Sequence, residues 1–506
     1  MKSVPRFPSL FFRQYLNCLS VSFLAAVVLL LLCEQAPLSV LAAVVGALAL
    51  LLTAAFQKLR YHRIALLFAA FGIALALLAV GSRSLKAELA VKASQGEGEC
   101  TGYVTHVDED GFDLKTTSLQ GKTKFVKIRV CSEEKPRFGD RVCLTLSEAR
   151  AADGAAASEG VVLLAEGEDV VRLSSSVLLS LVGDLRTYLT QVFGEGETGT
   201  FLSAILLGER SGLPASLSEA FRRTASSHLL AISGLHVTTI MGFLYFAARA
   251  FRIDRRAVNG IAVPTVLLLI LLTGLSVSVI RAGVMMLMTL LAYFSRRKSD
   301  PTTALFLAAL LIVLWEPRAV FSASFLLSFL STLSILTVSA PLSAYLESLL
   351  GGKKTKGTWE RLLMRLCALF LLPVLMAAAS FLFTLPVQFL LFEETCLLAP
   401  IYAVILIPLF APCLVLGLLW AVLSAVPAVS FAVGFAARGY SAFFLFLTRS
   451  LSAAAPEPAA VGAWGLPLAL FCSAALLFFM IVRAPLSRFY YAYPALFLIC
   501  LVCAAF

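Results

Sequence analysis

The stretch from Val258 to Ser295 reads VNGIAVPTVLLLILLTGLSVSVIRAGVMMLMTLLAYFS, and it decides the fold class. It holds two apolar runs, 258–275 and 277–295, each close to the roughly 20 residues that an α-helix needs to cross a bilayer. The whole chain has the same character, because 60% of its 506 residues are hydrophobic, far more than a soluble domain carries. The sequence therefore predicts a polytopic α-helical membrane protein.

Further apolar runs of spanning length lie on both sides of this stretch. Three of them fall within residues 1–90 and predict an N-terminal group of transmembrane helices. The others fall within residues 228–506, and all the runs together predict about 13 spans. They cover residues 15–33, 38–56, 64–81, 228–250, 302–316, 320–340, 366–392, 397–425, 428–450, 465–483 and 489–506.

The lysine and arginine residues of the loops collect on one side of this arrangement. Lys2, Arg6 and Arg13 precede the first run, and further basic residues follow the second and fourth. Cytoplasmic loops are enriched in Lys and Arg, which predicts a multi-pass protein of the cell (plasma or inner) membrane. Its N-terminus is cytoplasmic, and its C-terminus and residues 82–227 are extracytoplasmic. These loops explain the net charge of +11, although attraction of a polyanion such as nucleic acid is an alternative explanation.

Residues 95–172 form a polar interval that predicts a small extracytoplasmic β domain. Short segments of alternating apolar and polar residues are separated by turn residues, which is typical of strands. Several such strands fit a small, partly open barrel, and an OB-like fold is one option. The interval holds 15 acidic and 10 basic side chains, so it is no simple basic patch. The expected strands are Cys100–Val107, Phe112–Thr117, Lys124–Val130 and Arg141–Leu146.

Two sets of side chains in this domain have alternative roles. Its aromatic residues are expected in the core, although OB barrels also stack nucleic-acid bases on aromatic side chains. They are Tyr103, Phe112, Phe125 and Phe138. Its cysteines lie on the side of the membrane where oxidation is possible, so one disulfide is possible among the three. They are Cys100, Cys131 and Cys143.

Residues 175–227 connect the β domain to the next apolar run. Charged residues interrupt the apolar stretch Val177–Leu207, which predicts amphipathic helices lying on the membrane surface. A turn near Pro214 and a short helix over 217–224 follow. Three arginines in this region are candidates for a basic outer funnel: Arg210, Arg222 and Arg223.

Residues His228–Val237 read HLLAISGLHV and place two ionisable residues in an apolar run. Such groups at membrane depth face a protein interior or a wet cavity, because an unpaired one in hydrocarbon is costly. In one continuous helix, Ser233 and His236 are i, i+3 neighbours and His228 lies about 80° away, so the three share a broad face that could line a path. The alternatives are close helix packing, a proton-coupled role for the histidines, and metal binding by the two histidines.

The string from Leu207-Gly208-Glu209-Arg210 to HLLAISGLHV resembles the competence domain of the ComEC family of DNA-internalisation channels. The stretch Gly274–Ala282, GLSVSVIRA, is similar to the second motif of that family. Phe325–Phe329, FLLSF, is similar to its third motif. The N-terminal apolar runs and the polar interval also resemble the N-terminal module of the family, so the resemblance covers nearly the whole chain.

The resemblance implies a channel that passes single-stranded DNA from outside into the cytoplasm during natural transformation. It also implies an extracellular DNA receptor and a cytoplasmic helicase or ATPase as partners, since the sequence has no phosphate-binding loop. Many members continue into a metallo-β-lactamase-like domain, which this chain is expected to lack, so a separate nuclease is a further expected partner. No enzymatic activity, cofactor or metal is expected, because four histidines cannot build a His-rich two-metal cluster.

A channel of this kind must replace water around phosphates without holding the strand too tightly. Arg281 is the candidate phosphate contact, and the alternatives are a structural pair with an acidic side chain or snorkelling toward the outer interface. The candidates for the DNA path are His228, Ser233, Gly234, His236, Ser276, Ser278 and Arg281. Two other function classes stay open: a secondary transporter of a small anionic solute, and an intramembrane hydrolase using Ser233. A serine and a histidine on adjacent turns of one helix are poorly placed for proton transfer, which disfavours the hydrolase.

Overall fold

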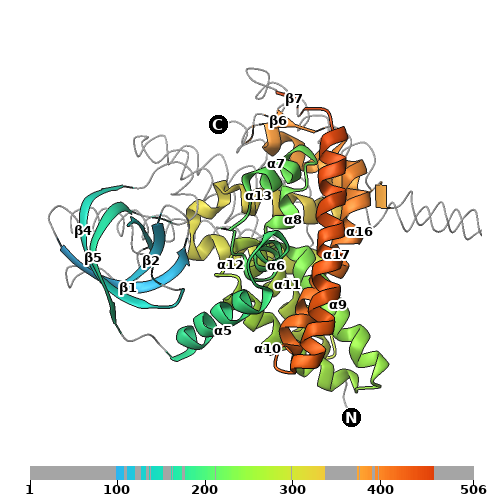
Figure 1. The fold of residues 1–506 in the computed structure, drawn as a ribbon, viewed down its shortest axis with the longest axis horizontal. Coiled ribbons are helices and arrows are strands. Elements are labelled where there is room, and N and C mark those ends of the chain that lie inside the picture. The colour runs from blue at the N-terminus through green and yellow to red at the C-terminus, as the bar shows by residue number, and fades with distance from the viewer. Residues whose placement is uncertain are drawn as a thin grey trace, which may run out of the picture. The chain divides into compact units, whose positions relative to one another are not determined.

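The computed structural model describes residues 98–336 and 373–460, apart from short gaps (Figure 1). The gaps are residues 108–110, 120–126, 133–135, 137, 152–160, 162, 174–176, 211, 298, 375, 390, 391, 393, 397 and 458. The apolar runs expected within residues 1–90, and those at 465–483 and 489–506, lie outside the described residues. The chain divides into two compact units, of which one is formed by Ser82–Leu290 and Ile405–Glu457 and the other by the remaining residues.

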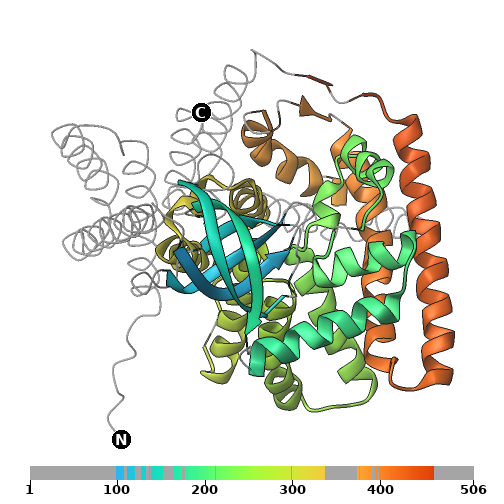
Figure 2. The same cartoon turned by 60° about the vertical axis from the view of Figure 1, so that its left-hand side comes forward.

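Five strands close into a barrel, which Figure 2 shows with its strands crossing obliquely. β1 (Gly98–Val107), β2 (Gly111–Leu119) and β3 (Lys127–Cys131) pair antiparallel in succession. β4 (Arg141–Ala151) pairs with β1, and β5 (Leu163–Leu173) closes the barrel by pairing antiparallel with β4 and parallel with β3. A five-stranded barrel of this kind is the architecture of OB folds. The predicted barrel is therefore confirmed, but it is closed rather than partly open, and its fifth strand was not expected.

The core of the barrel follows from the two-residue alternation of its strands. In β3, Ile128 and Val130 are buried, whereas Arg129 between them is partly exposed. In β4, Val142 is buried, whereas its neighbours on both sides are partly exposed. Phe112 is buried in this core, as expected. Tyr103 is not, because it lies between the buried residues Gly102 and Val104 and so on the outer face.

The three cysteines of the barrel are free thiols, so the disulfide considered from the sequence does not form. Cys100 is buried and pairs across the sheet with Leu144, so Cys143 lies on the opposite face. Cys131 is exposed at the end of β3. Burial raises the pKa of Cys100 to about 12, and burial together with the hydrogen bond to Glu99 raises the pKa of Cys143 to about 11. Both stay protonated at neutral pH, and the thiolate is the reactive form.

Three helices follow the barrel: α5 (Val177–Phe193), α6 (Glu197–Leu207) and α7 (Ala215–Arg223). α6 is buried along most of its length. Its Phe201 ring stacks on Phe221 of α7 and on Phe444, with ring centroids 6.2 Å and 5.7 Å away. Protein therefore covers the apolar side chains of α6. That α5 and α6 lie at the membrane surface stays a prediction.

Four described helices are long and apolar enough to cross a membrane. They are α10 (Arg255–Leu272), α11 (Val277–Phe294), α16 (Ala399–Leu423) and α17 (Pro427–Ala454). Each coincides with a predicted run to within a few residues. α10 starts where the Asp254 side chain accepts a hydrogen bond from the Arg256 backbone, as helix N-caps do. Gly274 and Leu275 then have positive φ angles of 68° and 60°, which end α10 and turn the chain into α11. The total of about 13 spans stays a prediction.

Three short helices of the second unit pack on one another: α12 (Pro301–Trp315), the 3₁₀ helix η1 (Pro317–Phe321) and α13 (Ala323–Ser334). Within the Phe325–Phe329 motif the two end rings stack with centroids 5.8 Å apart, and Phe329 also meets Phe306 of α12 edge-on at 5.7 Å. This motif therefore contributes to helix packing. A further short apolar helix covers Met376–Phe389, inside the predicted run 366–392.

Candidate functional site: a broken helix beside a buried arginine

The HLLAISGLHV segment is not one helix. α8 (Ser227–Leu230) ends after one turn, Ala231 and Ser233 are extended, and α9 (Gly234–Ala250) begins at Gly234. The prediction that His228, Ser233 and His236 share one helix face is therefore wrong. Non-helical backbone at membrane depth is tolerated only where protein buries it or a wet cavity lies beside it. At membrane depth, the break therefore marks a segment that is either enclosed by protein or beside a water-filled cavity.

Ser233 and His236 together cap the start of α9. The Ser233 hydroxyl accepts a hydrogen bond from the Leu235 backbone N–H at 3.3 Å. In return, the Ser233 backbone N–H donates to Nδ1 of His236 at 3.1 Å. This is a capping box in which histidine replaces the usual Glu or Gln. Because Nδ1 accepts a hydrogen bond, a neutral imidazole here carries its proton on Nε2.

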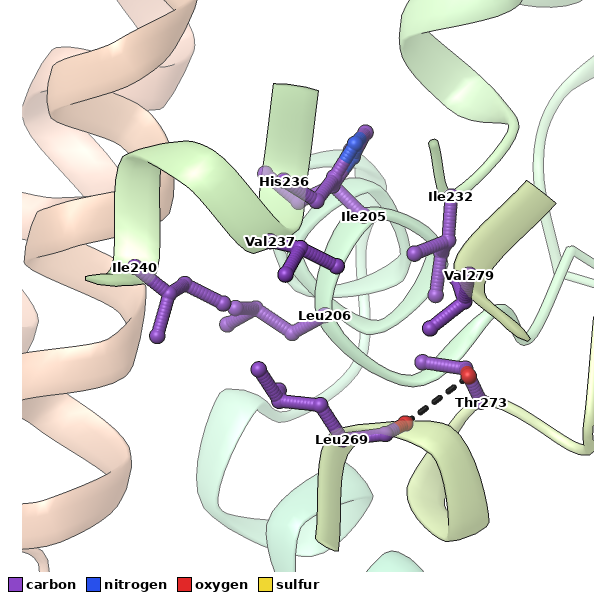
Figure 3. Close-up of a pocket in the computed structure, with 9 residues that line it drawn as sticks. All are labelled: Ile205, Leu206, Ile232, His236, Val237, Ile240, Leu269, Thr273 and Val279. Carbon is purple, nitrogen blue, oxygen red and sulfur yellow. Dashed lines mark hydrogen bonds between the residues drawn. The ribbon is translucent and has the colours of Figure 1, made fainter. Parts of the chain in front are cut away.

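The imidazole of His236 is enclosed, with only 1% of the residue exposed. It meets the ring of Phe410 in α16 edge-on, with centroids 5.2 Å apart. Below it lies a small cavity lined mainly by apolar side chains, among them Leu206, Leu269 and Val279 (Figure 3). Nε2 has no hydrogen-bond partner among the described residues. A buried N–H without an acceptor is unfavourable, so this position can accommodate an acceptor supplied from outside the chain.

Arg281 of α11 lies across the start of α9. A Cβ atom on Gly234 would sit 3.0 Å from Nη2 of Arg281 and 3.5 Å from Cβ of Ala282. The residue is only 6% exposed, and Nη1 lies 3.7 Å from Sδ of Met285. A helix N-terminus already carries partial positive charge, so a guanidinium beside it makes this position strongly attractive to an anion.

The other candidates for the DNA path lie on α8 and at the start of α11. His228 and Arg210 are close enough to His236 to interact with it electrostatically. Ser276 accepts a weak hydrogen bond from the Val279 backbone at 3.4 Å and starts α11. Ser278 is buried in the first turn of α11.

Two of the three outer funnel candidates lie on α7, where one pairs within the helix and the other bonds to α17. The exposed Arg222 forms an ion pair with Glu219, whose Oε2 lies 2.7 Å from Nε. Arg223 donates to the Ala455 carbonyl at the end of α17, at 3.2 Å. Arg210 lies close enough to His236 to interact with it electrostatically, and a funnel formed by the three arginines stays a prediction.

Sequence reasoning did not identify Arg186 of α5 as a site residue. Its side chain bonds to the C-terminal ends of both α6 and α10. Its guanidinium donates to the carbonyl of Leu207 at the end of α6, at 3.0 Å, and to the carbonyl of Leu272 at the end of α10. It also pairs with Glu209 at 3.2 Å and lies 4.8 Å from the ring centroid of Phe138. Burial lowers the pKa of Arg186, and the Glu209 carboxylate partly offsets this. The available signal was a single arginine in an otherwise apolar helix face.

Comparison with known proteins identifies the family. The sequence model of the family described as "Competence protein" matches residues 205–486, which is more than half of the chain. The chain belongs to the competence protein family. Within this competence protein, the matched region begins in α6 and contains the broken helix, Arg281 and α13.

Two relatives of this competence protein illustrate how far the similarity extends. ComE operon protein 3 of Bacillus subtilis (strain 168) is 28% identical over 163 residues, which are 32% of this chain and 21% of that protein. An uncharacterized protein of Aquifex aeolicus (strain VF5) is 30% identical over 160 residues, which are 31% of this chain and 38% of that protein. The chain therefore matches well under half the length of either relative. No solved structure matches it.

Proposed function

We propose that this chain forms the membrane path through which single-stranded DNA enters the cytoplasm, with the phosphates passing the start of α9. The observation that carries the proposal is the approach of Arg281 to Gly234, which puts a buried guanidinium on the N-terminus of a broken helix. Discontinuous helices whose N-terminal ends face the substrate are a recurring way to bind anions at membrane depth. Membership of the competence protein family supports DNA as the anion.

The same geometry suits a moving strand better than a tightly held solute. The start of α9 offers the guanidinium and the helix end for charge, and the Nε2–H of His236 for a hydrogen bond, while the adjoining wall is apolar. Conduction requires binding that is favourable enough for entry and weak enough for release. The secondary transporter of a small anion remains the alternative, because it would use the same positive end of α9.

The expectation that Ser233 and His236 are poorly placed for proton transfer, which disfavoured the hydrolase, is wrong. The helix break brings Ser233 Oγ to 3.2 Å from Nδ1 of His236, which is within reach for proton transfer. However, Nδ1 already accepts from the Ser233 backbone, and no described residue orients the ring through Nε2. A base that is itself oriented by a third group is the mark of an activated serine, so the pair acts as a helix cap in our proposal.

In this proposal the N-terminus is cytoplasmic, the C-terminus and the barrel are extracytoplasmic, and the helices lie in the lipid bilayer. An extracellular receptor delivers DNA, a separate nuclease prepares the single strand, and a cytoplasmic helicase or ATPase supplies the driving force. Arg210 lies at the outer mouth of the path. A separate ATPase is part of the proposal because the sequence has no phosphate-binding loop.

Uptake of labelled DNA into the cytoplasm tests the proposal. We expect a strain without the gene to bind DNA at its surface and to internalise none. We expect Arg281→Ala to reduce internalisation at least 10-fold, since it removes a buried charge–phosphate contact worth about 1.5–3 kcal/mol. Arg281→Lys should be intermediate, because it keeps the charge and loses the planar fork.

Two controls accompany this experiment. Arg256→Ala, at the exposed start of α10, should leave uptake unchanged. Membrane abundance of each variant is measured by immunoblot, so that loss of protein is not read as loss of transport. Normal uptake by the deletion strain would refute the DNA path, and abolition of uptake by Ser233→Ala with α9 intact would favour the hydrolase.

A further inference from the structure

The site at the start of α9 is closed in this structure. His236 is 1% exposed and Arg281 is 6% exposed, so a phosphate in solvent cannot reach either side chain. The ring of Phe410 in α16 is fully buried and covers the imidazole of His236, with centroids 5.2 Å apart. A strand can therefore pass this position only after part of the surrounding wall has moved.

The wall formed by α16 contains two prolines one turn apart, Pro408 and Pro412. Proline has no N–H, so the carbonyls of Val404 and Pro408 lack the donors that a regular helix supplies to them. Each proline ring also crowds the carbonyl of the preceding turn, which favours a bend. The helix nevertheless continues across both prolines, from Ala399 to Leu423. α16 thus has a weakened turn in its middle, and Phe410 lies between the two prolines.

Contacts with α9 and α17 hold this weakened turn in place. Besides meeting His236 of α9, the ring of Phe410 meets that of Phe444 of α17, with centroids 5.9 Å apart. The hydroxyl of Tyr440, also on α17, donates to the carbonyl of Leu409 at 3.2 Å. Both contacts are made by residues that lie between the prolines, so they stabilise the closed arrangement at the point where α16 bends most easily.

The part of α16 that follows the prolines is closely packed on its neighbours. A Cβ atom on Gly417 would lie 2.8 Å from a methyl group of Leu206 and 3.0 Å from one of Leu202, both in α6. The indole N–H of Trp420 donates to the hydroxyl of Ser430 in α17 at 3.2 Å. A bend at the prolines leaves this end of α16 fixed and moves the turn that carries Phe410.

We propose that α16 bends at Pro408 and Pro412 and withdraws Phe410 from His236, which opens the start of α9 to the phosphates of a passing strand. Phe410 is the gate of the path, and the hydrogen bond from Tyr440 favours the closed state. A buried aromatic ring suits this role, because apolar constrictions close channels to water and ions. The inference rests on the proposed function for the strand that passes, whereas the bending of α16 is measurable on the purified protein.

Replacement of both prolines by alanine tests the hinge. Pro408→Ala with Pro412→Ala restores two backbone hydrogen bonds to the closed helix. We expect a higher unfolding temperature in detergent and about 10-fold lower uptake of labelled DNA, because two additional bonds disfavour the bent state. Damage to the fold would instead lower both quantities. Pro264→Ala is the matched control, since Pro264 lies inside α10 and is exposed there, and it should leave uptake unchanged.

Hydrogen–deuterium exchange of the full chain in lipid nanodiscs measures the bending without transport. The backbone amides of residues 405–413 should exchange more slowly in the double proline variant than in the parent. In Tyr440→Phe they should exchange about 5-fold faster, because one hydrogen bond to the weakened turn is lost. Pro264→Ala should leave the exchange of this segment unchanged.

Uptake equal to that of the parent in the double proline variant, or exchange of residues 405–413 that neither variant alters, would overturn the inference. Failure of the hinge is distinguishable from failure of the path. Normal uptake by the double proline variant, alongside lost uptake in Arg281→Ala, would remove the hinge and leave the path standing. Normal uptake by the deletion strain would refute the path and the gate together.

Discussion

Replacement of Arg186 by glutamine should destabilise the protein far more than an ordinary loss of a surface charge. Arg186 donates to two helix C-terminal carbonyls and pairs with Glu209. Hydrogen bonds from charged donors contribute about 1.5–3 kcal/mol each, whereas the Glu209 pair is partly exposed and counts for little. Taking the lower value for two bonds, we expect the free energy of unfolding to fall by about 3 kcal/mol.

Thermal unfolding of the purified protein in detergent, followed by fluorescence-detected size-exclusion chromatography, measures this change. Arg222→Gln is the matched control, because Arg222 also forms an arginine–glutamate pair, exposed on α7, and solvent screening leaves such surface pairs with little effect on stability. Arg186→Lys should fall between the two, since an ammonium cannot reach both carbonyls in the same fork geometry. If Arg186→Gln lowers the unfolding temperature no more than Arg222→Gln does, the assigned role of Arg186 is refuted.

Three further predictions follow from the site and the barrel. Gly234→Val should displace the guanidinium of Arg281 and reduce DNA uptake as Arg281→Ala does, and the double variant should be no worse than either single one, because both changes act on one contact; additive losses would contradict this. His236→Ala should cost about 1 kcal/mol of stability through loss of the helix cap, whereas His236→Gln should recover most of it because Gln fits the same capping position; equal melting temperatures for the two would argue against the cap. Burial alone raises the pKa of Asp113, but the hydrogen bond from Arg129 and the charge of Lys127 outweigh it and hold the pKa below its ordinary value. The ion pair therefore stabilises the barrel fully at neutral pH and loses this effect as the pH falls below about 4, so Asp113→Asn should lower the unfolding temperature at pH 7 and make progressively less difference below pH 4.

The sequence predicted those elements whose signal is local. The runs 258–275 and 277–295 became α10 and α11 with nearly the same bounds, because uninterrupted apolar length is sufficient to define a membrane helix. The first strands of the barrel were also predictable from alternation. β5 was missed because Leu163–Ala165 is a run of apolar residues followed by Glu166-Gly167-Glu168-Asp169, which has the composition of a turn. Its place in the sheet depends on a parallel pairing with β3, which no local pattern specifies.

In the candidate site, too, features with a local sequence signal were predictable and long-range contacts were not. The approach of Arg281 to Gly234 joins two motifs that the sequence had already singled out, and their residue types were informative about an anion. The helix break was not anticipated, although Ser233-Gly234 is a common helix start, because the surrounding apolar residues also fit one long span. Arg186 escaped notice because its partners, Leu207 and Leu272, are 21 and 86 residues away.

Closure of the barrel has a consequence for how this protein can associate. An open sheet has two edge strands whose unpaired N–H and C=O groups accept a strand from another chain. In the described barrel β4 and β5 complete the circle, so no strand offers a free edge for such addition. Copies of the protein brought together at high density in a membrane are thus protected from joining through their barrels by strand exchange, and any contact between barrels must be made by side chains alone.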